Sequence, residues 1–198
     1  MKLFIFDMGG VVAYNTDVFP AVCGQLGMTA ERFYRLAGSS LERLLDGAIT
    51  GDEFWARFSS NYGTPVKEDL FAKYFKPHLD QSVVAILSRL KNSTRVVCGT
   101  NVFDSHYDYL VPRGYYDLFD AVYASNKMGL SKPHSKFYRH ILNAEGVRPE
   151  SAVFIDDDKT NVRAAEKLGI RSILFLDSKR LRSEIELLQP GQIHAIQL

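Results

Sequence analysis

Five short apolar runs alternate with amphipathic segments along most of the chain. The runs are LFIF at 3–6, RVVCG at 95–99, AVYA at 121–124, AVFI at 152–155 and SILFL at 172–176. They are almost continuously apolar, which is typical of strands buried on both faces of a parallel sheet. Segments 81–91, 103–113, 134–145 and 159–168 carry apolar residues three and four positions apart, which predicts helices. The alternation predicts an α/β fold: a Rossmann-like layered domain with a central, mainly parallel five-stranded sheet.

The stretch 15–79 breaks this rhythm because it holds no strand-like run. Ser39 with Glu42, and Thr50 with Glu53, each match the pattern of a capping box at a helix start. Glycines that fit the ends of successive short helices follow at Gly27, Gly47 and Gly63. We therefore predict an α/β core formed by residues 1–14 and 80–198, with a small α-helical cap inserted at 15–79.

Composition and charge narrow the class of protein. With 46% hydrophobic residues, the 198-residue chain can bury an ordinary core. Its net charge of +1 provides no field for binding nucleic acid or an anionic membrane, so we expect neither partner. Cys23 and Cys98 lie far apart among apolar neighbours, which favours reduced thiols and a cytoplasmic location. The first apolar run is too short for a signal-peptide core. The oligomeric state is left open.

Polar residues follow the predicted strands directly. Asp7 follows the first, Thr100 and Asn101 follow the second, and the run Asp156, Asp157 and Asp158 follows the fourth. In open α/β sheets, ligands bind outside the carboxyl ends of the strands. Acids gathered there repel one another unless a cation lies between them, and a hard cation such as Mg²⁺ prefers carboxylate oxygens. A single Asp is a common turn or cap residue, so it is the combination that predicts the site.

Lys132 is a candidate for the same edge of the sheet. It lies in GLSKPHSKFY, before a helix that Pro133 is expected to open as its first residue. A lone lysine is usually a solvated surface charge. Here a fixed cation would neutralise phosphoryl oxygens as charge shifts during transfer.

Four segments together resemble a known family. FDMGGVV at 6–12, VVCGTN at 96–101, the KP dipeptide at 132–133, and FIDDDKTN with AAEKLG at 154–169 resemble, in order, motifs I to IV of the haloacid dehalogenase superfamily. The predicted insert is similar to the helical cap that this family places between motifs I and II. The resemblance covers essentially the whole chain, and it implies a hydrolase that acts on a small phosphorylated metabolite.

The resemblance implies a nucleophile and a metal site. Asp7 matches the carboxylate that attacks phosphorus and forms an aspartyl-phosphate. Mg²⁺ would be held by the Asp7 carboxylate, the backbone carbonyl of Gly9 and Asp157, with Asp156 beside them as a nearer or outer ligand. A carboxylate nucleophile and an anionic phosphate approach each other only when positive charge offsets their repulsion.

The resemblance also implies groups that hold the phosphate. Thr100 matches the hydroxyl that binds a phosphoryl oxygen, and Asn101 lies where similar sequences carry a second polar contact. Lys132 matches the lysine that neutralises the nucleophile and the transferred group. Asn161 falls where many members carry a side chain that steadies the metal ligands.

The sequence departs from the family pattern at Gly9, where most of its phosphatases carry a second Asp as general acid and base. General acid–base catalysis typically contributes about 10²- to 10⁴-fold to the rate. Its loss leaves three explanations open: an easily departing leaving group, a proton donor elsewhere, or a catalytically impaired relative that binds a phosphorylated ligand or a protein. Tyr14, His106 and His134 are donor candidates by position. A branch of the family with Gly here includes sugar phosphatases, so a sugar phosphate is favoured. A phosphomutase or a 2-haloacid dehalogenase ranks third.

The predicted cap carries further candidates. Its aromatic residues are expected to fill its interior, because aromatics at helical spacing usually do. Arg43 and Arg57 could meet a second anionic group of a substrate, although exposed helix charges are the more ordinary interpretation. The turns at 14–17 and 78–81 are candidate hinges for closure of the cap over the site.

Overall fold

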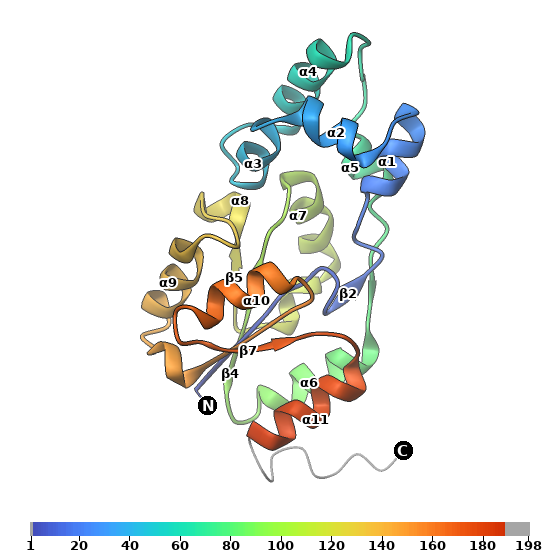
Figure 1. Ribbon diagram of the computed structural model, residues 1–198. Coiled ribbons are helices and arrows are strands. Elements are labelled where there is room, and N and C mark those ends of the chain that lie inside the picture. The colour runs from blue at the N-terminus through green and yellow to red at the C-terminus, as the bar shows by residue number, and fades with distance from the viewer. Residues whose placement is uncertain (1, 189–198) are drawn as a thin grey trace.

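The computed structural model describes residues 2–188, and a five-stranded parallel sheet lies at its centre (Figure 1). The strands are β1 (Leu3–Phe6), β4 (Arg95–Thr100), β5 (Ala121–Ala124), β6 (Ala152–Asp156) and β7 (Arg171–Leu174). They lie in the order β5-β4-β1-β6-β7, and every neighbouring pair is parallel. This confirms the predicted fold class, and it places β1 between β4 and β6, the strands that end in Thr100 and Asp156.

Helices cover both faces of the sheet because successive side chains of β1 point in opposite directions. Phe4 and Phe6 belong to a cluster with α6 (Gln81–Leu90) and α11 (Ser178–Leu188), whereas Leu3 and Ile5 pack with α9 (Ser135–Ala144) and α10 (Lys159–Glu166). The remaining elements of this part are α7 (Asp104–Leu110), α8 (Ser125–Met128) and the short 3₁₀ helices η1 (Val111–Arg113), η2 (Tyr115–Leu118) and η3 (Pro149–Ser151).

Five helices gather at one end of the molecule, in the segment where we predicted a cap (Figure 1). They are α1 (Phe19–Leu26), α2 (Ala30–Ala37), α3 (Ser40–Leu45), α4 (Gly51–Tyr62) and α5 (Leu70–Tyr74). The capping box of Thr50 and Glu53 is confirmed at the start of α4. That of Ser39 and Glu42 is wrong: Ser39 already has helical backbone angles, and its side chain accepts no capping hydrogen bond. An N-cap side chain needs extended backbone to reach back to the helix.

A two-stranded antiparallel ribbon joins the five helices to the sheet domain. β2 (Ala13–Tyr14) pairs with β3 (His78–Leu79), and the Asn15 side chain donates to the Lys76 carbonyl at 2.7 Å. We expected no strand between 15 and 79, so β3 is a correction. Two residues are too few to show a period in the sequence, and this strand exists because the two crossing segments lie side by side.

The helices α1–α5 share a hydrophobic core with the sheet domain. One cluster of buried residues runs from Phe4 on β1 to Phe33 on α2 and Phe54 on α4. Across the junction, Phe71 on α5 stacks on Phe103, with ring centroids 4.6 Å apart. The boundaries at 15–79 and 80–198 stay a prediction, and residues 189–198 of the predicted core lie outside the described part of the chain.

A buried polar contact also connects α3 to the sheet domain. The Ser125 hydroxyl at the start of α8 donates to the Leu45 carbonyl at 2.6 Å and accepts from the Val102 amide at 3.0 Å. Beside it, Gly47 has a φ of +65°, and a Cβ atom there would overlap the Asn126 carbonyl oxygen. Only glycine combines this backbone conformation with such a close approach to the Asn126 carbonyl. The junction is therefore closely packed at Gly47.

None of the helices within residues 2–188 combines the length and the apolar character that a membrane crossing requires.

Candidate active site

Asp7 and Asp156, at the carboxyl ends of β1 and β6, contact Lys132 from the segment before α9. The Lys132 ammonium lies 2.9 Å from Asp7 Oδ1 and 2.7 Å from Asp156 Oδ2. The Lys132 side chain is 1% exposed and that of Asp156 is fully buried. Burial by itself lowers the pKa of Lys132, but the two carboxylates outweigh it and raise the pKa above its ordinary value. Lys132 is therefore a fixed, buried cation next to Asp7.

Two asparagines hold this ion pair in place. Asn101 donates from Nδ2 to the Lys132 carbonyl and accepts at Oδ1 from the Lys132 amide, both at 2.9 Å. Asn161 on α10 donates from Nδ2 to both oxygens of Asp156, at 3.1 and 3.2 Å. The Asn101 side chain thus orients the backbone of Lys132, and Asn161 orients Asp156. Thr100, at the end of β4, is 3% exposed and lines the same pocket.

The lysine segment differs from the prediction in one respect. Helix α9 begins at Ser135, with His134 as its N-cap, so Pro133 is not its first residue. The Lys132 backbone is held by Asn101 across the sheet edge. Pro133 therefore lies in the turn that carries Lys132 to the site, before the helix.

Carboxylate oxygens of Asp7, Asp156 and Asp157 all lie within 4.8 Å of one another. Burial, followed by the charge of Asp156, raises the pKa of Asp7 to about 7 although Lys132 opposes the shift. Burial and Asp156 likewise raise the pKa of Asp157. Three carboxylates at this separation need further positive charge, and their oxygens are the donors that Mg²⁺ prefers. The residues present therefore fit a divalent cation.

The loop after β1 is shaped by two glycines with different constraints. Gly10 has a φ of +74°, and a Cβ atom there would overlap the Asp157 carboxylate, so the carboxylate requires glycine at this position. Gly9 has no positive φ, and a Cβ atom there would lie 3.1 Å from Thr16 Oγ1. A side chain at position 9 would therefore start beside the Thr16 hydroxyl.

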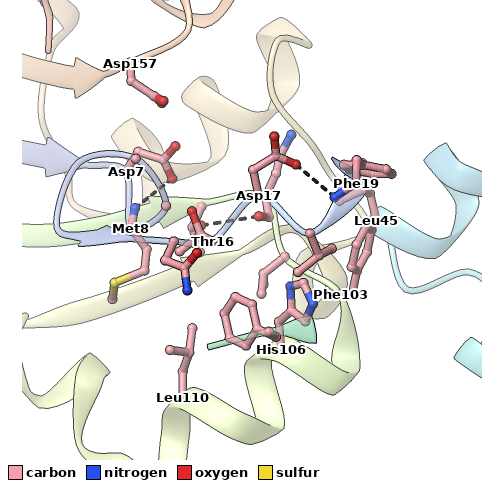
Figure 2. A pocket seen from close by; sticks show the side chains of 18 of the residues that line it. Asp7, Met8, Thr16, Asp17, Phe19, Leu45, Phe103, His106, Leu110 and Asp157 are labelled. Atoms are coloured by element: carbon pink, nitrogen blue, oxygen red, sulfur yellow. Dashed lines mark hydrogen bonds between the residues drawn. The ribbon is translucent and has the colours of Figure 1, made fainter. Parts of the chain in front are cut away.

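A pocket of roughly 700 Å³ opens above Asp7 and Asp157. Figure 2 shows these two carboxylates at one end and Phe19, Leu45 and Phe103 at the other. The lining comes from the loop after β1, from α1–α3, and from the segment that follows β4. The site therefore lies where the helices α1–α3 meet the carboxyl ends of the strands.

The candidate proton donors differ in their relation to this pocket. Tyr14 lines it and is 55% exposed. His106 also lines it, but its Nε2 donates to the Phe71 carbonyl at 3.2 Å, and burial lowers its pKa to about 4. Its ring is therefore neutral near pH 7, and its one N–H is engaged. His134 is exposed at the start of α9 and is not among the lining residues.

Sequence reasoning missed Thr16, Asp17 and the apolar wall from α1–α3. Asp17 Oδ1 accepts from the Phe19 amide at 3.0 Å, and both Thr16 and Asp17 line the pocket (Figure 2). They follow a two-residue strand, so no pattern distinguishes them from ordinary loop residues. Arg43 and Arg57, which the sequence offered as cap cations, are exposed and lie outside the pocket lining.

Comparisons with known proteins agree with this geometry. The family model of haloacid dehalogenase-like hydrolases matches residues 1–169, so the chain belongs to this family. A sesquiterpene phosphatase of Aspergillus oryzae is 29% identical over 89% of this chain and 91% of its own. The structure of a predicted HAD-like hydrolase from Porphyromonas gingivalis has a TM-score of 0.80 at 23% identity and covers 96% of this chain and 99% of its own. A Bacteroides thetaiotaomicron family member in complex with magnesium and inorganic phosphate has a TM-score of 0.72 at 22% identity, covering 91% and 98%. The family match shows a hydrolase, and the phosphatase relative, which aligns over most of the chain, supports a phosphoric monoester hydrolase.

Proposed function

We propose that the chain is a Mg²⁺-dependent phosphatase of a small phosphorylated metabolite and that it works through an aspartyl-phosphate. The observation that supports this most directly is the buried Lys132, which contacts Asp156 and also Asp7, a residue that lines the pocket. A fixed cation beside a carboxylate at the end of a central strand suits transfer of a phosphoryl group, which consists mainly of positioning and charge stabilisation.

The two steps follow from the contacts of Asp7. Its Oδ1 accepts from the Met8 amide at 2.7 Å and contacts Lys132, which leaves Oδ2 for attack on phosphorus. In the first step an Asp7 oxygen–phosphorus bond forms and the bond to the leaving oxygen breaks. In the second, a water oxygen bonds to the phosphorus and the Asp7 oxygen–phosphorus bond breaks, which releases inorganic phosphate and restores the Asp7 carboxylate. A Mg²⁺ ion held by Asp7, Asp157 and the Gly9 carbonyl, with Asp156 beside it, would neutralise the phosphoryl oxygens.

The leaving oxygen needs a proton, and Gly9 has no side chain to provide one. The Thr16 hydroxyl lies 3.1 Å from the position that a Cβ atom at residue 9 would take, and it is suited to orient a water molecule or the leaving oxygen by hydrogen bonding. A hydroxyl is a far weaker acid than a carboxyl group, so substrates whose leaving group departs without full protonation are favoured. Gly9 also supports the second candidate function, binding of a phosphorylated ligand with little turnover.

The test is phosphate release, with and without Mg²⁺, from acyl, aryl, sugar and nucleotide phosphates. Wild type is compared with Asp7→Asn, which removes the nucleophile, and we expect release to fall by roughly a thousandfold or more. Equal release by the two proteins would contradict the proposal. Binding of inorganic phosphate without release from any substrate would favour the second candidate. The expected preference for sugar phosphates and the cytoplasmic location stay predictions.

A further inference from the structure

A large part of the pocket wall away from Asp7 and Asp157 is apolar. Phe19 starts α1, Leu41 and Leu45 come from α3, and Val102 and Leu110 come from the sheet domain, and all five line the space. Phe19 also packs edge-to-face against Phe103, with ring centroids 6.5 Å apart. Apolar side chains from α1 and α3 and from the sheet domain thus line the same pocket, and Figure 2 shows Phe19, Leu45, Phe103 and Leu110 among them.

The same wall offers little to a second charged group. Within residues 2–188, no lysine or arginine is among the lining residues, and the only cation at the site is Lys132 beneath Asp7. His106 is neutral near pH 7 because burial lowers its pKa to about 4. Asp17 adds negative charge on the side of α1. A carboxylate or a second phosphate on the substrate would therefore meet no opposite charge in the pocket.

Several polar side chains of the lining are already engaged within the protein. The Asn15 amide donates to Lys76, the Asp17 carboxylate accepts from Phe19, and Asn101 is held by the Lys132 backbone. A sugar that lay against the apolar part of the wall would exchange the hydrogen bonds that its hydroxyl groups make with water for contact with hydrocarbon, which is unfavourable. The pocket also has about twenty times the volume of one water molecule, far more than a phosphate group fills.

We infer that the substrate is a monophosphate ester of a largely apolar organic group, which lies between the α1–α3 wall and Phe103 while the phosphate meets Asp7 and Lys132. This rests on the proposed function for the phosphate end of the pocket. This substrate class differs from the sugar phosphate that the sequence favoured. The protein would select its substrate by hydrophobic contact with the organic group, and it would not bind a second anionic group.

Binding of non-hydrolysable alkylphosphonates tests this without turnover. Methyl-, butyl- and octylphosphonate carry one phosphonate group and differ in apolar length, and calorimetry in the presence of Mg²⁺ measures their dissociation constants. We expect the dissociation constant to fall by roughly tenfold or more from methyl to octyl, because each buried methylene contributes favourably. Equal constants across the series for the wild-type protein would overturn the inference.

A pair of variants locates the apolar contact. Leu41→Lys places a charge in the wall and is expected to abolish most of the gain with chain length. Leu187→Lys makes the same substitution at an 81% exposed residue of α11, outside the pocket, and should keep that gain. An equal gain in both variants would place the alkyl chain elsewhere and contradict the inference.

Phosphate release from octyl phosphate and from 4-alkylphenyl phosphates separates the two proposals. The alkylphenyl esters share nearly the same leaving group, so differences in kcat/KM among them report apolar contact alone. Graded phosphonate binding without any release would support the apolar site and contradict the phosphatase. Release that needs Asp7 and Mg²⁺, together with ungraded binding, would support the phosphatase and overturn this inference.

Discussion

Among single residues, position 9 decides how far this site can act as a general acid. Gly9 leaves the space beside Thr16 without a carboxyl group, yet a Cβ atom there meets Thr16 Oγ1 at only 3.1 Å. An aspartate at position 9 therefore needs Thr16 to shift by a few tenths of an ångström.

We predict that Gly9→Asp raises kcat modestly, because it restores a carboxyl proton donor. Adding Thr16→Ala removes the close contact with that side chain, so the double variant should raise kcat further, by roughly 10²-fold or more on substrates with a poor leaving group. Steady-state kinetics on matched aryl and alkyl phosphates measure the effect, and Thr16→Ala alone is the control. A double variant no faster than wild type, with Mg²⁺ binding unchanged, would show that position 9 does not face the leaving group.

Lys132 is the second residue whose contribution to stability and activity can be predicted from its contacts. It neutralises Asp7 and Asp156 inside the protein, and its removal leaves two buried carboxylates together. We predict that Lys132→Met lowers the free energy of unfolding by about 3–5 kcal/mol and abolishes phosphate release. Lys127→Met is the matched control, because Lys127 pairs with Asp104 with 48% of its side chain exposed, so its loss should change stability by less than about 1 kcal/mol. Denaturant titration measures both. Equal effects would contradict the structural role of Lys132.

At the scale of elements, His106 connects α7 to the end of α5. Its ring stacks on Phe75 with centroids 3.7 Å apart, and its Nε2 donates to Phe71. Burial keeps its pKa near 4, well below the ordinary value of 6.5. The unfolded chain therefore binds a proton between pH 6.5 and 4 that the folded protein does not, so acid favours unfolding in this window.

We predict that, as the pH is lowered from 6.5 to 4, His106 decreases the free energy of unfolding by about 1.4 kcal/mol per pH unit. His106→Gln keeps a donor for Phe71 without titrating, so its loss of stability in this range should be smaller by roughly 2–3 kcal/mol. His134→Gln, at an exposed position, should behave like wild type. Urea titrations at pH 7 and pH 4.5 measure the free energy of unfolding of each protein. An equal loss between the two pH values for wild type and His106→Gln would contradict the prediction.

The elements also show what hydrophobic patterns predict well. The five strands lie at the continuous apolar runs, and the helices α6, α9 and α10 lie at the segments of helical period, because burial on one or both sides leaves a clear apolar pattern in the chain. The ribbon of β2 and β3 did not appear in the pattern, since two-residue strands carry no period. Ser39 matched a capping pattern, but the chain entered α3 with helical backbone already in place.

For the whole molecule, a small polar junction links α3 to the sheet edge, in addition to the shared hydrophobic core. Ser125 joins Leu45 on α3 to Val102 in the loop that follows β4, and that loop starts at the predicted phosphate-binding residues. Opening of the helical segment would break this contact, and the ribbon of β2 and β3 would bend at the expected hinges.

We predict that Ser125→Ala raises KM by several-fold and lowers the free energy of unfolding by about 1–3 kcal/mol, because it leaves the Leu45 carbonyl and the Val102 amide without their partner. Hydrogen exchange should become faster in α3 while the β1 and β6 amides stay protected. Ser88→Ala is the control, since its exposed hydroxyl donates only within α6. Unchanged exchange in α3 would show that Ser125 does not hold the helical segment closed.

The strands and helices of the sheet domain could be predicted from local patterns in the chain, and Asp7, Asp156, Asp157 and Lys132 could be selected as candidate site residues, because strand ends and family motifs are local features. What these residues contact depends on packing in three dimensions: Asn101 holds the Lys132 backbone, Thr16 lies beside Gly9, and α1–α3 supply apolar side chains to the pocket wall. These contacts join residues from separate elements, and no local period records how such elements pack. For the same reason the sequence favoured a sugar phosphate, whereas the packed pocket favours an apolar ester.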